Sequence, residues 1–258
     1  MRQHMVKDNV VELHDHASER QIRTDLAALY RITDHLGWTE LIFNHITAKV
    51  PGPDEHFLIN PFGLHYSEVT ASNLVKLDLA GNVIGETEWG VNVAGYIIHS
   101  AIHEARPDVK CVMHTHTTTG QAVSCMENGL ELIGFNSAML VGRVGYHAFE
   151  GITVEDDEKP RLVESLGDKN FLILRNHGLL TCGETVAQAF TRMHLLQRAC
   201  DVQVMALSLG RPLAAIPEDA AARSRAFVEA GDANTSGADR AFRAMQRIVD
   251  RIDPGYRD

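Results

Sequence analysis

The sequence predicts a layered α/β domain built on a largely antiparallel or mixed sheet. Three observations lead to this fold class. Strand-like and helical segments alternate along most of the chain, two early strand-like runs are separated only by the turn Pro51-Gly52-Pro53, and 45% of the 258 residues are hydrophobic, enough for a sizeable core. We expect the body of this domain at residues 18–210, after a loose arm at 1–17 and before a helical tail at 211–258.

The first half of the body is expected to contain two helices and four strands. Apolar residues repeat at helical spacing from Ile22 until Gly37 stops the run, and from Ala94 until Pro107 ends it. Short β-branched and apolar runs bounded by turn residues indicate strands. The expected elements are a helix from residue 18, strands at 41–50, 56–60 and 75–79, a helix at 91–105 and a strand at 109–116.

The second half is expected to continue with mixed elements and to finish in helices. Its longest periodic stretch carries an apolar stripe from Val186 to Val204, and Gly210-Arg211-Pro212 separates it from the tail. The expected elements are a helix at 117–126, strands near 131–135 and 139–146, a helix at 159–166, a strand at 171–175, a long helix at 184–209, and tail helices at 218–230 and 238–252.

Composition excludes several classes of protein. The net charge of −10 argues against a nucleic-acid partner. The apolar runs are far shorter than the roughly 20 residues of a membrane helix, so no membrane association is expected. The polar N-terminus lacks a secretory signal, which predicts a cytoplasmic protein. The four cysteines form no Cys-x-x-Cys pair, and we expect buried, reduced thiols.

Three histidines stand where a metal ion could be held. His114 and His116 are two residues apart on an expected strand, so their side chains project from the same face. His177 follows the apolar run at 171–175 and precedes Gly178, at a strand end where side chains gather at sites. Three imidazoles with open positions suit a catalytic divalent ion, although exposed strand-end histidines would give the same pattern.

Longer segments extend this pattern into a family resemblance. The stretches VMHTHTTTGQAVS and LRNHGLLTCGETVAQAF resemble the class II aldolase and adducin family, over roughly residues 20–209. The resemblance implies a three-layer α/β/α sandwich around a central, mainly antiparallel sheet, and a homotetramer with sites at subunit interfaces. It also implies one divalent metal ion per subunit on His114, His116 and His177, with zinc expected first and manganese, iron or cobalt as alternatives.

The sequence departs from the sugar-phosphate aldolases of this family at two places. Their Ser-Ser-Glu segment, whose glutamate ligates the metal and moves protons, reads Val93-Ala94-Gly95 here. Their phosphate-binding segments read Asn44-His45-Ile46-Thr47 and Phe62-Gly63, so hydroxyl and amide donors are replaced. We therefore expect a non-phosphorylated carboxylic acid as the substrate, as in the adducin-like bacterial branch that includes decarboxylases.

Three further histidines are candidates for catalytic roles. His45 lies where the family binds the anionic end of its substrate, and it could bind a carboxylate, donate a proton or simply be a hydrogen-bonded strand residue. His99, one helical turn beyond Gly95, could support the metal site or pack in the helix. His147 could line the site from a loop. The expected pocket-lining residues are Asn60, Gly63 and Asn92.

Without the glutamate, the expected activity is that of a metal-dependent carbon–carbon lyase acting on a hydroxy- or aromatic acid, with decarboxylation favoured. Loss of a positioned acid–base group costs about 10²–10⁴-fold, and decarboxylation depends on it less than aldol cleavage does. The alternatives are an aldolase on a non-phosphorylated substrate, an iron-dependent oxygenase, and a non-catalytic adducin-like interaction module.

Overall fold

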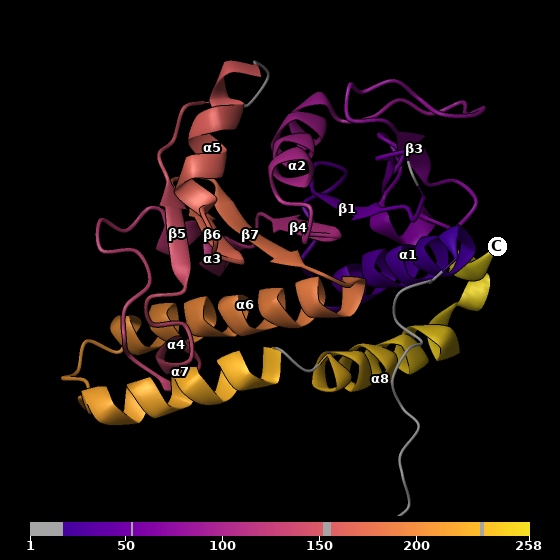
Figure 1. The fold of residues 1–258 in the computed structure, drawn as a ribbon. Coiled ribbons are helices and arrows are strands. Elements are labelled where there is room, and N and C mark those ends of the chain that lie inside the picture. The colour runs from indigo at the N-terminus through magenta and orange to yellow at the C-terminus, as the bar shows by residue number, and fades with distance from the viewer. Residues whose placement is uncertain (1–17, 53, 152–155, 233–234) are drawn as a thin grey trace, which may run out of the picture.

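The structure, a computed structural model, describes residues 18–258 except 53, 152–155 and 233–234 (Figure 1). The arm expected at 1–17 lies outside the described residues. Seven strands form one sheet in the order β3-β2-β1-β4-β7-β6-β5. Neighbouring strands are antiparallel except β5 and β6, which are parallel. The strands are β1 (His45–Lys49), β2 (Phe57–Ile59), β3 (Val75–Leu77), β4 (Cys111–Thr115), β5 (Val144–His147), β6 (Phe171–Leu174) and β7 (Gly178–Gly183).

Helices cover both faces of this sheet, which confirms the expected three-layer α/β/α sandwich. Helices α2 and α5 lie on one face, whereas α1 and α6 lie on the other with α8 packed outside them (Figure 1). The helices are α1 (Glu19–His35), α2 (Val93–Ala105), α3 (Thr118–Ser124), α4 (Phe135–Ala138), α5 (Lys159–Leu166), α6 (Val186–Ser208), α7 (Glu218–Asp232) and α8 (Ser236–Ile252), with short 3-10 turns η1 (Tyr66–Glu68), η2 (Asp156–Glu158) and η3 (Pro254–Arg257).

The alternation of side chains along the strands divides the core into two main parts. In β4, Val112 packs in the cluster beneath α2 and α5, whereas Cys111 and Met113 pack in the larger cluster with α1 and α6. All three side chains are fully buried. Because successive residues of β4 face opposite layers, His114 is directed to the same layer as Val112, that of α2 and α5.

Two parts of the expected strand pattern are wrong. Residues 131–135 form no strand, and Phe135 instead begins α4. Strand β7 was not expected at all, because no element was predicted between the strand at 171–175 and the long helix at 184–209. Asn176 has a φ of 56°, which turns the chain so sharply that β6 and β7 form a hairpin with Leu174 opposite Gly178.

The C-terminal helices pack on the body of the domain. Phe242, Val249 and Tyr256 are buried in the cluster that also contains α1 and α6, and Arg243 forms a two-pronged ion pair with Asp25. The domain boundary at residue 210 remains a prediction.

The described residues contain no helix that is long and apolar enough to span a membrane. The cysteines are unpaired, and three of them are buried as expected, whereas Cys125 is exposed.

Candidate metal centre

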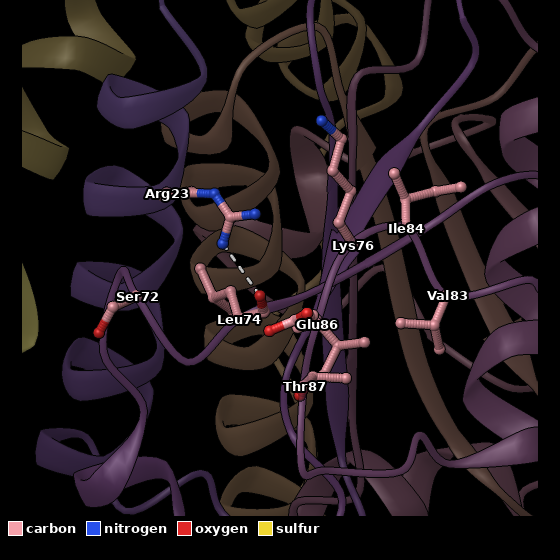
Figure 2. A pocket seen from close by; sticks show the side chains of 9 residues that line it. Arg23, Ser72, Leu74, Lys76, Val83, Ile84, Glu86 and Thr87 are labelled. Atoms are coloured by element: carbon pink, nitrogen blue, oxygen red, sulfur yellow. Dashed lines mark hydrogen bonds between the residues drawn. The ribbon is translucent and has the colours of Figure 1, made fainter.

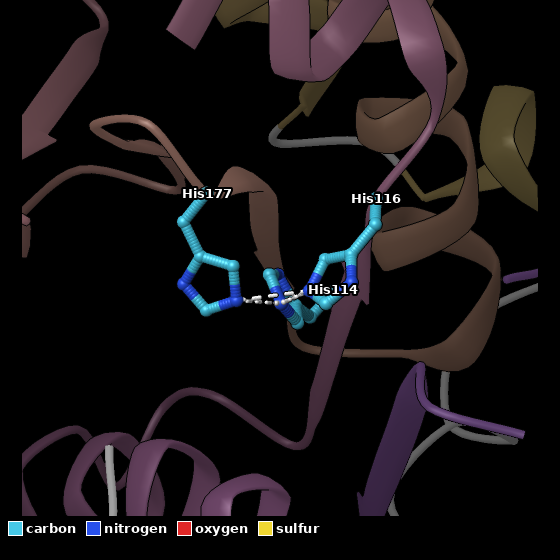
Figure 3. Close-up of side chains that lie close together, drawn as sticks. All are labelled: His114, His116 and His177. Carbon is cyan, nitrogen blue, oxygen red and sulfur yellow. Dashed lines mark hydrogen bonds between the residues drawn. The ribbon is translucent and has the colours of Figure 1, made fainter. Parts of the chain in front are cut away.

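The three histidines converge at one edge of the sheet. His114 lies in β4, His116 follows that strand, and His177 lies in the turn between β6 and β7. Because β4 pairs with β7, this turn lies next to the end of β4. Their Nε2 atoms face one another at 2.7, 2.9 and 3.3 Å (Figure 3). Ligand nitrogens about 2.0–2.1 Å from a tetrahedral ion lie roughly 3.3 Å apart, so small ring rotations would admit a metal.

The outer ring nitrogens of two of these histidines are fixed by acceptors. Nδ1 of His114 donates to the carbonyl oxygen of Leu179 at 2.8 Å, and Nδ1 of His116 donates to Glu40 Oε2 at 2.5 Å. Each bond leaves an Nε2 lone pair turned inward, as a metal ligand requires. Burial, with the neighbouring histidines, lowers the pKa of His177 to about 4 and that of His114 well below its usual range. Neutral imidazoles whose lone pairs converge are suited to hold a cation.

Glu40 is a site residue that sequence reasoning missed. It lies in the irregular segment before β1, 76 positions from His116, and its side chain is 44% exposed. No spacing rule connects the two residues, because only the pairing of β1 with β4 brings them together. The carboxylate orients His116 by holding its outer ring nitrogen.

His45 occupies the space that a side chain at position 95 would need. Gly95 lies in the first turn of α2, and a Cβ there would lie 2.6 Å from Cδ2 and 2.7 Å from Cγ of His45. His45 is the cross-strand neighbour of His114, and the two ring centroids are 5.0 Å apart. A buried imidazole beside the three histidines therefore takes the place of the missing glutamate side chain.

His99 supports His45 rather than the three histidines directly. Its Nε2 lies 2.9 Å from Nδ1 of His45, and its Nδ1 lies 2.7 Å from Oγ1 of Thr47. His103 contacts the same hydroxyl through Nε2 at 2.8 Å. Burial lowers the pKa of His45 to about 3 and that of His99 well below its usual range. These rings are therefore neutral at pH 7, and the role of His45 depends on which nitrogen carries the hydrogen.

Both ring nitrogens of His147 have partners among the described residues. It is the last residue of β5 rather than a loop residue, because the strand runs parallel to β6 as far as Leu174. Its Nδ1 contacts Oγ of Ser165 at 3.0 Å and its Nε2 contacts Glu158 at 3.1 Å. Both ring nitrogens are thus engaged within the layer of α5, which favours a structural role.

The expected pocket-lining residues separate into different roles. Asn60 is buried, and its Oδ1 accepts a hydrogen bond from the hydroxyl of Tyr30 at 2.9 Å. Asn92 caps α2 and accepts from the backbone of Gly95 at 3.4 Å, so it positions the helix start. Gly63 is exposed with a φ of +108°, which favours glycine.

Asn44 is a second residue that sequence reasoning missed as a site candidate. Its side chain is buried beside His45, and neither carboxamide atom has a hydrogen-bond partner among the described residues. Such atoms usually indicate a bound water or ligand.

The surface hollow in Figure 2 lies outside this centre. It has a volume of about 290 Å³ and contains no member of the histidine set. Its cations are already engaged, because Arg23 donates to the carbonyl oxygens of Ala71 and Leu74, and Lys76 bonds to Glu19. The hollow therefore does not compete with the histidines as a candidate site.

The sequence profile of the Class II Aldolase and Adducin N-terminal domain family matches residues 24–204 of the chain. The chain belongs to this family. The match covers β1 to β7 and most of α6, and so it contains the histidines and the sheet that positions them.

The relatives include both aldolase-like proteins and adducins. A Pseudomonas aeruginosa protein, whose name assigns it provisionally to the class 2 aldolases, is 50% identical over 244 residues, 93% of each chain. Alpha-adducin of Rattus norvegicus is 46% identical over 93% of this chain but only 34% of the adducin.

Solved structures of family members have the same fold. An aldolase II superfamily protein from Pseudomonas syringae is 46% identical and superposes with a TM-score of 0.88, covering 94% of this chain and 97% of that one. L-fuculose 1-phosphate aldolase from Glaciozyma antarctica is 30% identical, with a TM-score of 0.81 and 93% of each chain covered.

Replacing Glu40 by glutamine in this family member should weaken metal binding about 10–100-fold, because His116 loses its charged hydrogen-bond partner. Competition with a chromogenic chelator for zinc measures the change. Glu104→Gln, a carboxylate on the exposed part of α2, is the matched control and should bind metal as the wild type does. Equal zinc affinity in Glu40→Gln and wild type would contradict the assigned role.

Proposed function

We propose that this chain is a divalent-metal-dependent carbon–carbon lyase that decarboxylates a non-phosphorylated hydroxy- or aromatic acid. The observation that carries this proposal is the pairing of two features at one place. Three imidazole nitrogens converge on a common point, and the neighbouring position 95 is a glycine whose side-chain space is filled by His45.

The residues of the centre would have separate tasks. His114, His116 and His177 would hold the ion, with zinc as the first candidate and manganese, iron or cobalt as alternatives. A bound ion supplies Lewis-acid stabilisation of negative charge next to the departing carboxylate. The carboxamide of Asn44, which is buried without a partner among the described residues, is available to bind a polar group of the substrate.

The absence of a carboxylate at position 95 favours decarboxylation over aldol cleavage. Aldol cleavage needs a base for the substrate hydroxyl, and loss of such a group costs about 10²–10⁴-fold. Decarboxylation releases CO₂ without that base, and the carbanion that it leaves would then take a proton from water. The carboxylate of Glu40 contacts the centre, but it is engaged by His116.

Purified protein reconstituted with Zn²⁺, Mn²⁺ or Fe²⁺ is expected to release CO₂ from members of a panel of hydroxy- and aromatic acids. The His177→Ala variant should release none above background, since it lacks one of the three imidazoles. Formation of pyruvate or an aldehyde without CO₂ would replace the proposal by an aldolase, and oxygen consumption would replace it by an oxygenase.

The adducin relatives favour a second candidate, a non-catalytic interaction module, since alpha-adducin is 46% identical to this chain. In that case the metal would be dispensable, and fully folded protein purified without metal would show the same thermal stability as protein with added zinc.

We further propose a homotetramer with the centre at a subunit interface. The apolar side chains of Leu41, Phe43 and Val93 are exposed beside β1 and the start of α2, close to His45 and Gly95. Their exposure supports the proposal that another subunit covers this edge. Light scattering would measure the assembly.

A further inference from the structure

A buried chain of hydrogen bonds leads from the metal centre through the α2 layer to a backbone carbonyl. It runs from His45 to His99 at 2.9 Å, on to the hydroxyl of Thr47 at 2.7 Å, and from there to His103 at 2.8 Å. Nδ1 of His103 lies 3.4 Å from the carbonyl oxygen of Val109, where the chain ends. All four side chains are buried.

The direction of these bonds follows from the carbonyl end. A carbonyl oxygen can only accept, so Nδ1 of His103 carries the hydrogen and its Nε2 holds a lone pair. The Thr47 hydroxyl must then donate to His103. Because a hydroxyl has one hydrogen, Thr47 can only accept from His99, whose Nδ1 therefore carries the hydrogen.

The same logic determines the state of His45. Nε2 of His99 is left as an acceptor, so Nδ1 of His45 donates to it and Nε2 of His45 holds a lone pair. This requires neutral rings, and burial lowers the pKa of His103 to about 3 and that of His99 well below its usual range. Nε2 of His45 has no hydrogen-bond partner among the described residues. It is also not one of their fully buried side-chain atoms that lack a partner, so it is open to a ligand.

We propose that His45 is a specificity-determining residue whose Nε2 is a fixed hydrogen-bond acceptor beside the metal centre, selecting acids that present a hydroxyl group there. The inference rests on the proposed function and narrows its substrate class to hydroxy acids. A hydroxyl donates to the lone pair, whereas a carboxylate or keto oxygen is repelled by it. Of the roles open to His45 from sequence, carboxylate binding and proton donation are thereby disfavoured.

The test compares Thr47→Val, which removes the hydroxyl at nearly constant volume, with Thr47→Ser, which keeps it. Long-range ¹H–¹⁵N spectra of the wild type should show His45 and His99 with hydrogen on Nδ1. Thr47→Ser should keep this state and Thr47→Val should lose it. At equal zinc content, the wild type should bind lactate more tightly than propionate. Thr47→Val should lower the ratio of the propionate dissociation constant to the lactate dissociation constant about tenfold, which is the effect of roughly one hydrogen bond.

Three results separate the possibilities. Hydrogen on Nε2 of His45 in the wild type would overturn the inference without any variant, even if Thr47→Val does not fold. An unchanged lactate-to-propionate ratio in Thr47→Val would attribute the preference to metal chelation alone and would also overturn it. If neither acid binds the zinc-loaded protein, the proposed function and the substrate selection fail together, while the spectra still decide the state of His45.

Discussion

Replacement of both His114 and His116 by alanine is expected to abolish metal binding and, with it, all CO₂ release. The change removes two of the three Nε2 atoms that lie within 3.3 Å of one another, and a single remaining imidazole cannot retain a divalent ion against a chelator. Elemental analysis of protein dialysed against dilute chelator measures the loss, which should be from about one ion per chain to background.

The matched control removes two histidines outside the centre. His35→Ala/His56→Ala should keep the wild-type metal content, because neither residue belongs to the cluster of possible ligands. The thermal stability of both variants must also be measured, since His114 is fully buried and its loss leaves a cavity that could destabilise the fold. A folded His114→Ala/His116→Ala protein that retained stoichiometric metal would contradict the assignment of the centre.

Replacement of Gly95 by alanine is expected to destabilise the fold by about 1–3 kcal/mol, the usual cost of overpacking. In an exposed helix the same change would stabilise by up to about 1 kcal/mol. Here the new Cβ would lie 2.6 Å from a His45 ring that is held by its bond to His99. The free energy of unfolding in urea measures the effect.

A double-mutant cycle isolates the cause of that loss. In a His45→Ala background the space is open, so Gly95→Ala should cost much less, and the two changes should be strongly non-additive. Gly231→Ala in α7, where nothing lies within 4 Å of the new Cβ, is the control and should be neutral or stabilising. A cost at Gly95 that is the same in both backgrounds would mean that His45 does not fill the space.

The pairing of Gly95 with His45 also bears on the divergence of this chain from sugar-phosphate aldolases. A glutamate at position 95 would not fit beside the present His45 ring, because even its Cβ would lie 2.6 Å from that ring. We therefore expect Gly95→Glu alone to lose stability without gaining aldolase activity.

The sequence predicted regular elements well where periodicity was long or turns were explicit. The helix at 159–166 is confirmed by α5, and the expected long helix at 184–209 by α6. The failures lie in short apolar runs, where strand and helix patterns are indistinguishable. Strand β7 was missed because its residues are apolar on both faces, as a strand buried between two helical layers must be.

The sequence by itself determined which histidines were candidates for the centre and that position 95 lacks a carboxylate. Both follow from local rules, since side chains two residues apart on a strand share a face, and the residue type at position 95 is read directly from the sequence. Only the tertiary structure decided that Glu40 contacts His116, that His45 fills the space above Gly95, and that Nδ1 of His103 lies against a carbonyl oxygen at residue 109. These contacts join residues brought together by strand register and helix docking, which no local pattern encodes.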